Sequence, residues 1–294
     1  MPPLATVIVP GWDVAPFAAA ALDSLRAQTF GGWRAVLVDD GSTDGTGEIF
    51  ARYAAVDDRF VLAPHDHQRG LGAARNTGLD LVDTAYVGFL DADDVMMPGA
   101  LETLVGSLES SGSDLVAGAY VRLRPEGGGY RAGEVQPWVA AATSPRRIAT
   151  TLDAHPEVTG NIVAWSKLSR TAFWRDHGLR FPEGVLYEDQ EIAQRMYTSA
   201  RAFDVVPDVV VQWRVRADGT SITQREADPR VFQACLQAMR DGLRALAAHE
   251  PARRARAGQI LRMDIPRLAE IVHLDPRLSP LLSAFAAEVE ALSS

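Results

Sequence analysis

Short apolar runs that alternate with amphipathic stretches fill the first part of the chain and limit its fold more than any other feature. The runs are rich in β-branched residues, and each stops at a turn-forming segment, as buried strands do. They lie at residues 4–9, 35–38, 60–63 and 86–90. Apolar residues at helical spacing lie between and after them, in residues 17–28, 49–53, 70–81 and 98–108. This alternation predicts an α/β fold, with a Rossmann-like, mostly parallel sheet and flanking helices.

The pattern changes after Asp114. The later segments are predicted as a strand at 115–121, a flexible glycine-containing loop at 125–133, helices at 169–177 and from about 188, and two strands within 203–211 that Pro207 separates. From Pro229 onward, Ala, Leu and Arg recur at helical spacing, and four prolines divide this tail into four helix-length segments. We therefore predict a domain at residues 1–225 and a helical C-terminal accessory region at 226–294, for assembly into homo-oligomers or for docking of an acceptor.

Three carboxylates follow directly on the predicted strand at 86–90. In an open α/β sheet, ligands bind beyond the carboxyl ends of the strands. Extended backbone points Asp91 and Asp93 to the same side, with Asp94 next to them. Clustered carboxylate oxygens suit Mg²⁺ or Mn²⁺, and these ions suit a diphosphate. The alternative is a helix N-cap with solvated acidic neighbours.

Two further strand ends carry residues that a nucleotide site would use. Asp39 and Asp40 follow the second strand and can accept a hydrogen bond from a base or ribose, although the same sequence also forms good turns. After the third strand, glycines stand beside Arg69 and Arg75 at a helix start, which suits a phosphate or a nucleobase. The segment lacks the last glycine of GxGxxG and follows the third strand, which argues against a dinucleotide site. Together the three strand ends predict a nucleotide site.

Charge and composition narrow the partners and the compartment. The net charge of −9 argues against general nucleic-acid binding. The single cysteine, Cys235, shares a helical face with apolar residues and is expected to be a core residue and not a nucleophile. We see no secretory signal and no apolar stretch of about 18 residues, so a cytoplasmic protein is expected, with peripheral association at the inner face of the membrane left open. His65 and His67 are expected to be solvated and not metal-bound.

These motifs together resemble the family 2 inverting glycosyltransferases, a group with the GT-A fold that uses nucleotide-diphospho-sugars. The resemblance covers about residues 4–225. Its segments are VIVP at 7–10, LDSLRAQTF at 22–30, VLVDDGSTDGT at 36–46, GLGAARNTGL at 70–79, FLDADD at 89–94, WSKLSRTAFWRDHGLRFPEGVLYEDQEIA at 165–193 and WRVRADGTSIT at 213–223. Gly11-Trp12-Asp13 stands where a Tyr-Asn pair commonly follows the first proline, a departure that concerns the contact with the nucleobase.

The resemblance implies a role for particular residues on the donor side. Pro10 and Asp40 would line the nucleobase pocket, and Arg75 would lie beside the base or the diphosphate. Asp91 would contact the ribose or the metal shell, and Asp93 would be the metal ligand.

It implies further roles on the acceptor side. Asp189 would be the general base, with Glu188 left for acceptor contact. Trp165 would stack on a sugar, unless it is a core aromatic residue. Arg214, followed by Ser221, would close over the diphosphate, unless it lies on a solvated strand edge.

The expected function is therefore Mn²⁺- or Mg²⁺-dependent transfer of a sugar, with inversion, from a nucleotide-diphospho-sugar, with UDP favoured. The acceptor would be a hydroxyl of a glycan, a polyol-phosphate polymer or a lipid-linked molecule in cell-surface glycan or polysaccharide biosynthesis. One alternative is a sugar-phosphate nucleotidylyltransferase, which would need a glycine-rich, arginine-containing loop after the first strand, where this chain has only residues 10–13. The other is an inactive carbohydrate-binding or scaffold module, which loss of the carboxylates would indicate.

Overall fold

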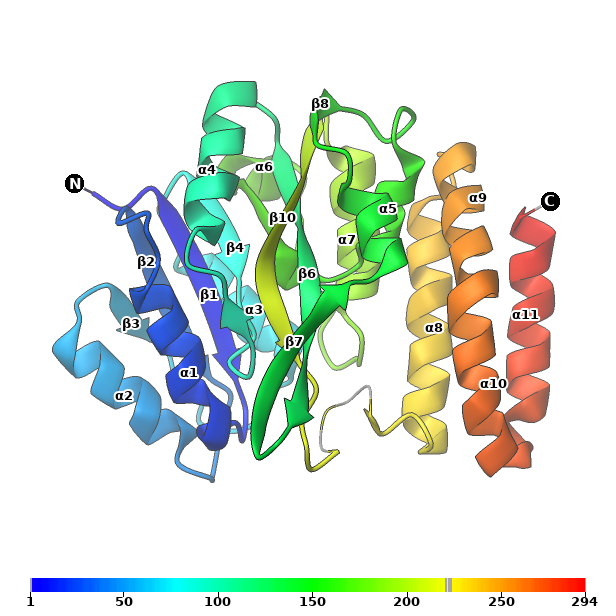
Figure 1. Cartoon of the computed structure of the whole chain (residues 1–294), viewed down its shortest axis with the longest axis horizontal. Helices are drawn as coiled ribbons and strands as arrows, with labels where there is room; N and C mark the ends of the chain where they lie inside the picture. The colour runs from blue at the N-terminus through cyan, green and yellow to red at the C-terminus, as the bar shows by residue number, and fades with distance from the viewer. Residues whose placement is uncertain (1, 220, 222–223, 294) are drawn as a thin grey trace.

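The computed structural model describes residues 2–219, 221 and 224–293. A mixed sheet runs through the molecule in the order β3-β2-β1-β4-β9-β6-β10-β5, with β7 paired to β6 and β8 paired to β10. Helices cover it, and the last helices of the chain stand together at one end (Figure 1). The predicted α/β class, with a central sheet and flanking helices, is confirmed.

The first half of the sheet has the alternation that the sequence predicts. Its parallel strands are β1 (Ala5–Gly11), β2 (Trp33–Asp39), β3 (Phe60–Leu62) and β4 (Tyr86–Phe89). The helices that connect or follow them are α1 (Ala15–Arg26), α2 (Thr46–Val56), α3 (Leu71–Asp80) and α4 (Ala100–Ser111). Pairing in parallel places the carboxyl ends of β1, β2 and β4 at one edge of the sheet, the lower edge in Figure 1.

The second half of the sheet adds antiparallel pairs that the alternating pattern did not indicate. The strands are β5 (Val95–Met96), β6 (Leu115–Glu126), β7 (Gly129–Val135), β8 (Arg147–Thr150), β9 (Lys167–Arg170) and β10 (Phe203–Arg214). Short β9 lies antiparallel between β4 and β6, while β6 and β10 are parallel. The helical segments here are α5 (Pro137–Thr143), η1 (Pro156–Gly160), η2 (Ala164–Ser166), α6 (Thr171–Asp176) and α7 (Asp189–Ser199).

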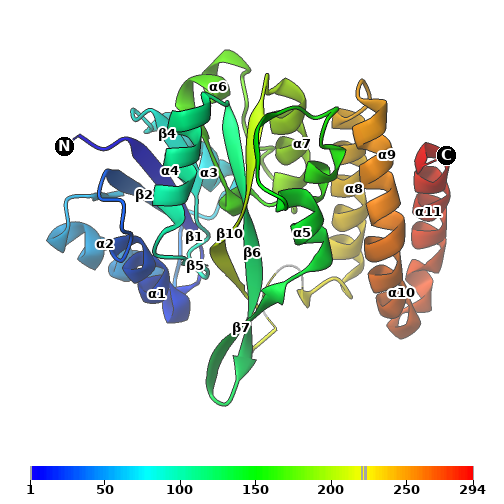
Figure 2. The same cartoon turned by 45° about the horizontal axis from the view of Figure 1, so that its top comes forward.

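Two sequence predictions in this half are wrong. The segment 125–133 is not a loop but the end of a β6–β7 hairpin, which extends away from the body of the molecule (Figure 2). Gly127 and Gly128, at φ +58° and +81°, form its turn. Pro207 does not split residues 203–211 into two strands. β10 is continuous, and its register shifts between Val206 and Val209 let the exposed proline bulge out of the ladder.

The tail forms helices α8 (Pro229–Ala245), α9 (Glu250–Gln259), α10 (Ile265–Leu274) and α11 (Ser279–Ser293). A π-helical segment, Ile260–Asp264, joins α9 to α10 without a break, and a 3₁₀ turn, Pro276–Leu278, precedes α11. Pro266 therefore does not end a helix as we expected. It lies in the first turn after the π segment, where the hydrogen-bond ladder is already rearranged.

Two hydrophobic clusters hold the chain together. The larger lies between the sheet and its helices, and the smaller is built by the tail helices. Cys235 is buried in the smaller cluster, as predicted, and burial raises the pKa of its thiol to about 12. Leu246 and Ala252 of the tail belong to the larger cluster, so the two parts share a core, and the domain boundary after residue 225 stays a prediction. Among the described residues, no helix is both long enough and apolar enough to span a membrane.

Candidate active site

Three neighbouring strand ends bring Pro10, Asp40 and the acidic segment together. The amide of Asp40 donates to the carbonyl of Gly11 (2.9 Å), and the amide of Ala92 donates to the carbonyl of Pro10 (3.2 Å). The polar residues that follow β1, β2 and β4 are therefore backbone neighbours at one edge of the sheet. The proximity of Asp40 to the acidic segment follows the sequence prediction, and Pro10 was named there only through the resemblance.

The Asp40 carboxylate is buried and organises the start of α3. It accepts hydrogen bonds from the backbone amides of Arg69 (2.9 Å, to Oδ1) and Gly70 (2.8 Å, to Oδ2). Gly70 has φ +94°, a conformation that favours glycine. The carboxylate thus fixes the loop that leads into the helix carrying Arg75.

His65 is a polar residue of this site that the sequence analysis missed. Instead of being solvated, its ring is buried, with Nδ1 2.6 Å from Asp40 Oδ1 and Nε2 2.9 Å from Thr77 Oγ1. Its amide also donates to the carbonyl of Asp39 (2.8 Å), so it continues the line of β3 beside β2. His67 is exposed, as expected. The position of His65 directly after a strand was the available signal.

Arg75 links two distant parts of the chain. Its guanidinium is buried, donates to Asp91 Oδ1 through Nη2 (2.7 Å) and pairs with Glu188 through Nη1. It lies 5.1 Å from the centre of the Phe181 ring. The two carboxylates raise the pKa of Arg75 against the opposing effect of burial, so it is a permanent cation. The structure therefore joins the acidic segment after β4 to the start of α7.

Close backbone packing makes this link feasible. Gly72, on the first turn of α3, faces the carbonyl oxygen of Pro182, and a Cβ at this position would lie 2.1 Å from that oxygen. Asn76, one turn later, donates to the Phe181 carbonyl (2.9 Å) and accepts from the Phe181 amide (3.0 Å). The segment before Glu188 is thus clamped onto α3.

Glu188 and Asp189 stand at the N-terminal end of α7. Burial raises the pKa of Glu188, and the Arg75 charge opposes this rise. Burial, followed by the charge of Glu188, raises the pKa of Asp189 to about 7. Among the described residues, none forms a hydrogen bond with the Asp189 carboxylate. Asp189 is thus a carboxylate that can accept a proton near neutral pH.

Lys167 of β9 is a buried cation in the surroundings of Asp189. Its Nζ donates to the carbonyl of Asn161 (2.8 Å), to Asn161 Oδ1 (2.9 Å) and to the carbonyl of Val163 (2.5 Å). Burial lowers the pKa of Lys167 to about 7, and the charge of Asp189 opposes this fall. Three oxygen acceptors match the three N–H donors of the ammonium form.

The rest of the acidic segment is tied to the end of β10. Arg216 pairs with Asp93 Oδ2 through Nε (2.8 Å) and Nη2 (2.7 Å). Asp94 Oδ1 accepts from the Arg214 amide (2.7 Å), whereas its Oδ2 is buried with no partner in the described part of the chain. Burial and the neighbouring carboxylates raise the pKa of Asp94 well above its usual range. Asp94 therefore acts as a structural link between the acidic segment and β10.

Arg214 also contacts the acidic segment directly. Its Nε donates to the carbonyl of Asp93 (2.7 Å), and its guanidinium lies 4.4 Å from the centre of the Tyr130 ring on the hairpin. The side chain is buried, so it does not lie on a solvated strand edge.

The residues of the acidic segment fit a divalent metal with few protein ligands. Asp91 and Asp93 keep side-chain exposures of 22% and 17%, and both offer the hard oxygen donors that Mg²⁺ and Mn²⁺ prefer. In the described residues, no group of three or more acidic, histidine or cysteine side chains could hold a metal. The protein can thus supply two carboxylates, and substrate phosphates and water would complete the shell.

Trp165 and Ser221 are two predicted site residues that, within the residues the structure describes, have no hydrogen bond to the polar cluster above. Trp165 is buried and packs edge-on against Tyr120, with ring centres 4.7 Å apart, which is the core position that the sequence left as the alternative. Ser221 is half-buried, and its carbonyl accepts from the Gln224 amide (2.9 Å). Residues 220, 222 and 223 of the same predicted segment lie outside the described residues. In the described part of the chain, no hydrogen bond joins Trp165 or Ser221 to the site carboxylates.

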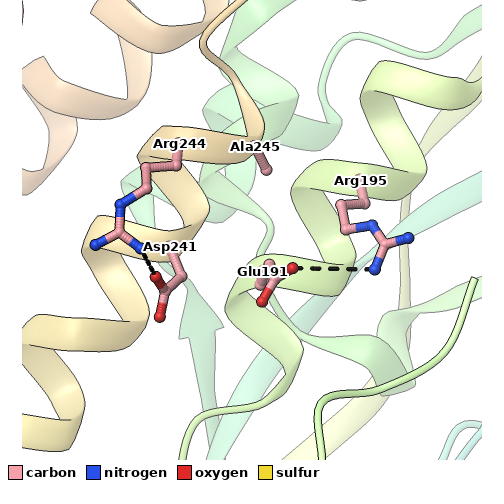
Figure 3. A pocket seen from close by; sticks show the side chains of 5 residues that line it. All are labelled: Glu191, Arg195, Asp241, Arg244 and Ala245. Atoms are coloured by element: carbon pink, nitrogen blue, oxygen red, sulfur yellow. Dashed lines mark hydrogen bonds and ion pairs between the residues drawn. The ribbon is translucent and has the colours of Figure 1, made fainter.

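An open depression of about 500 Å³ lies between α7 and α8, and none of the site carboxylates described above lines it (Figure 3). Glu191 pairs with Arg195 on one wall and Asp241 with Arg244 on the other, so each helix pairs its own charges. Ordinary i,i+3 and i,i+4 pairs of this kind belong to a solvated surface. The depression is therefore not the candidate site.

Comparison with known proteins gives consistent results. The family model described as Glycosyl transferase family 2 matches residues 6–175. Glycosyltransferase GlyA of Streptococcus pneumoniae serotype 4 is 30% identical over 245 residues, which are 82% of this chain and 34% of that protein. Uncharacterized glycosyltransferase EpsJ of Bacillus subtilis is 31% identical over 192 residues, 64% of this chain and 54% of its own. This chain thus spans only part of the relatives it matches.

A solved structure shows the same fold. The crystal structure of S. aureus TarS 1-349 in complex with UDP-GlcNAc aligns with a TM-score of 0.70. The alignment covers 100% of this chain and 89% of that chain, at 20% sequence identity. At this level of identity, the likeness concerns the fold alone.

Proposed function

This chain belongs to glycosyl transferase family 2 and has its GT-A fold, and on that premise we propose that it transfers a sugar from a nucleotide-diphospho-sugar to an acceptor hydroxyl. The main support for this proposal is that Arg75, a buried cation, forms ion pairs with both Asp91, at the proposed donor side, and Glu188, beside the proposed base. A site of this kind places a leaving group and a proton acceptor within reach of one substrate.

The nucleobase is proposed to bind at Pro10 and Asp40. A carboxylate has about four lone-pair positions, and Asp40 uses three of them on Arg69, Gly70 and His65. The remaining position, on Oδ2, suits one N–H of a base, such as N3–H of uracil. We therefore propose a UDP-sugar as the donor, which is consistent with the UDP-GlcNAc bound in the TarS structure.

The diphosphate is proposed to lie between Asp93, Arg216 and Arg75. Asp91 and Asp93 would hold Mn²⁺ or Mg²⁺ there, and this ion would supply charge stabilisation for the departing nucleoside diphosphate. Arg216 now neutralises Asp93, so it must exchange this carboxylate for a phosphate oxygen when the donor binds. An arginine fork matches phosphate geometry well, and such an exchange retains two hydrogen bonds.

Asp189 is proposed as the general base. The acceptor oxygen forms a bond to the anomeric carbon, the bond from that carbon to the phosphate oxygen breaks, and the acceptor proton moves to Asp189. A pKa of about 7 suits a base that works near neutral pH. One displacement at one carbon inverts its configuration, so an inverting transferase is proposed. Glu188 is paired with Arg75, which fits a role in orienting the base or the acceptor.

The acceptor is proposed only by class. A hydroxyl of a glycan, a polyol-phosphate polymer or a lipid-linked sugar suits the proposed chemistry, within cell-surface glycan or polysaccharide biosynthesis. The cytoplasmic location, the peripheral association with a membrane and the homo-oligomer through the tail helices stay predictions. The two alternative functions are disfavoured because the site carboxylates are all present and residues 10–13 form no glycine-rich loop.

A donor screen tests the proposal. Release of nucleoside diphosphate is measured from UDP- and GDP-sugars, with Mn²⁺, with Mg²⁺ and with EDTA, using water and candidate sugars as acceptors. A UDP-sugar is expected to be turned over in Mn²⁺ or Mg²⁺, and Asp189→Asn is expected to lose at least about 10²-fold in kcat while it still binds UDP. Full activity of the Asn variant would exclude Asp189 as the base. Turnover of GDP-sugars alone would overturn the donor proposal.

A further inference from the structure

The two residues that flank Glu188 and Asp189 both contact the part of the chain beyond residue 225. Tyr187 precedes the pair, and its ring packs against the tail's hydrophobic cluster. Its hydroxyl donates to Glu226 Oε1 (3.0 Å). Gln190 follows the pair, and its Oε1 accepts from Nη2 of Arg256 on α9 (3.3 Å). The first turn of α7 is thus held from both sides by a part of the chain that lies outside the matched family segment.

Each anchor is itself rigidly held. Glu226 is buried and pairs with Arg267 of α10, so the acceptor for the Tyr187 hydroxyl is fixed by an ion pair. Arg256 is also buried, and its other amino group donates to Gln259 Oε1 (2.9 Å) and lies 3.4 Å from Asp264 Oδ2.

Close packing of helices adds a third attachment. Gly242 of α8 faces α7, and a Cβ there would lie 3.5 Å from both the Gln190 carbonyl and the Gln194 side chain. The two helices are therefore in van der Waals contact at this position.

The backbone at Tyr187 shows that these anchors determine the local conformation. Tyr187 has φ +60°, in the left-handed region that bulky residues rarely adopt. Such a conformation persists when surrounding contacts over-determine it. Here the contacts are the ring in the tail cluster and the hydroxyl on Glu226. A glycine would adopt the same φ without strain but could not reach the tail.

We propose that the tail helices position the catalytic base, with Tyr187 and Gln190 as the positioning residues that transmit their hold to Asp189. This inference rests on the proposed function of Asp189 and gives residues 226–294 a role inside the reaction. It requires no new ligand. It also explains why a helical region outside the sheet packs directly against α7 (Figure 1).

Loosening the first turn of α7 would change the pKa of Asp189, and this change can be measured. The ionisable groups that surround the Asp189 carboxylate come from several elements. They are Glu188 of the same turn, Arg75 of α3, Asp91 after β4, Tyr120 of β6 and Lys167 of β9. Burial is the largest cause of the raised pKa of Asp189. Water that enters when the turn loosens would therefore lower this pKa and move the acidic limb of the kcat–pH profile below 7.

The test uses the full chain with four variants. Tyr187→Phe removes one hydroxyl, Tyr187→Gly removes the anchor but suits the backbone, and Gln190→Met removes the acceptor for Arg256. Tyr53→Phe is the matched control, because it removes a tyrosine hydroxyl that donates to Ala19 on the far side of the sheet. For each, UDP release from the UDP-sugar selected by the donor screen is followed from pH 5 to 9, with water as acceptor. UDP affinity in Mn²⁺ is measured by calorimetry, and folding by thermal melting.

We expect Tyr187→Phe and Gln190→Met to lower kcat about five- to tenfold each, with the acidic limb displaced to lower pH and the affinity for UDP unchanged. Tyr187→Gly should have the larger effect of the two Tyr187 substitutions. A folded Tyr187→Phe or Gln190→Met variant with parental kcat and an undisplaced limb would overturn the inference. The inference would also be overturned if the variants lost affinity for UDP and this loss explained their lower rate. If instead Asp189→Asn keeps parental kcat, the proposed function fails, and the two failures are thus distinguished.

Discussion

The pH dependence of turnover is the sharpest test of the site, because the structure gives the proposed base an unusual pKa. Asp189 is half-buried beside Glu188, and its loss of hydration, followed by the charge of Glu188, raises its pKa from 3.8 to about 7. Only the ionised carboxylate can accept the acceptor proton. At pH 6 about a tenth of the molecules would carry this form, and at pH 8 about nine-tenths. We therefore expect kcat to fall about tenfold for each pH unit below 7.

The perturbation is Asp189→Asn, which keeps the shape of the side chain but cannot take up a proton at these pH values. The variant should lose about 10²- to 10⁴-fold in kcat at pH 8, and its residual activity should no longer have a limb near 7. Glu191→Gln is the matched control, since Glu191 lies in the same first turn of α7 but pairs with Arg195 at the surface. It should keep both the rate and the limb.

The assay is steady-state release of UDP at saturating donor from pH 5 to 9, with UDP affinity measured at each pH. A parental kcat that stays constant from pH 9 down to pH 5 would refute the raised pKa of Asp189. If kcat of the Asn variant still fell below pH 7, a group other than Asp189 would be responsible for the pH dependence.

The same shift also predicts the sign of a stability effect. A carboxyl group whose pKa is raised by folding contributes fully to stability below its unfolded pKa, near 4, and loses this contribution as the pH rises through about 7. Asp189→Asn should therefore raise the Tm, relative to the parent, more at pH 8 than at pH 5. An equal difference at the two pH values would contradict the assigned shift.

Three other substitutions test separate parts of the structure. Asp93→Asn should abolish turnover and weaken UDP binding in Mn²⁺ but not in EDTA, and equal calorimetric affinities with the parent under both conditions would exclude Asp93 as a metal ligand. Gly72→Ala should cost at least about 2 kcal/mol in urea unfolding, because its Cβ would lie 2.1 Å from the carbonyl oxygen of Pro182; Gly106→Ala, on an open face of α4, is the control. Asp204→Ala should cost about 3–5 kcal/mol in the same assay, because it leaves two buried hydroxyl donors, Ser107 and Ser113, and the part-buried Ala149 amide without their acceptor. A loss below about 1 kcal/mol would mean that water replaces the carboxylate.

The proximity of Asp40 to the acidic segment was predictable because both follow a simple rule. Asp40 and Asp91 each come just after a strand-like apolar run, and parallel strands bring such positions to one edge. The sequence supplied both the runs and the alternation that makes them parallel. It could not indicate β9, a short antiparallel strand between β4 and β6, because four residues carry too little pattern.

The acceptor side was reached only through the resemblance, and its central contact could not be read from local pattern. Arg75 looked like a phosphate-binding arginine at a helix start, yet it is buried and paired with Asp91 and Glu188. Arg75 and Glu188 are distant in the chain, and the spacing of apolar residues in a sequence cannot predict which distant side chains form an ion pair. Buried arginines are uncommon, so exposure was the natural expectation. His65 was misjudged for the same reason, since its partners, Asp40 and Thr77, are set by the packing of β3 against α3.

The ion pairs and buried charges around Asp189 act together on its protonation. Three carboxylates, Asp91, Glu188 and Asp189, share their surroundings with two cations, Arg75 and the ammonium form of Lys167. With Asp189 ionised, the cluster therefore carries one excess negative charge, and with Asp189 protonated it is neutral. Incomplete hydration of these groups favours the neutral state. In the proposed reaction, the proton released by the acceptor hydroxyl would therefore bring the cluster to charge balance when it binds Asp189. The buried ion pair of Arg75 with Glu188 keeps water from neutralising these charges instead.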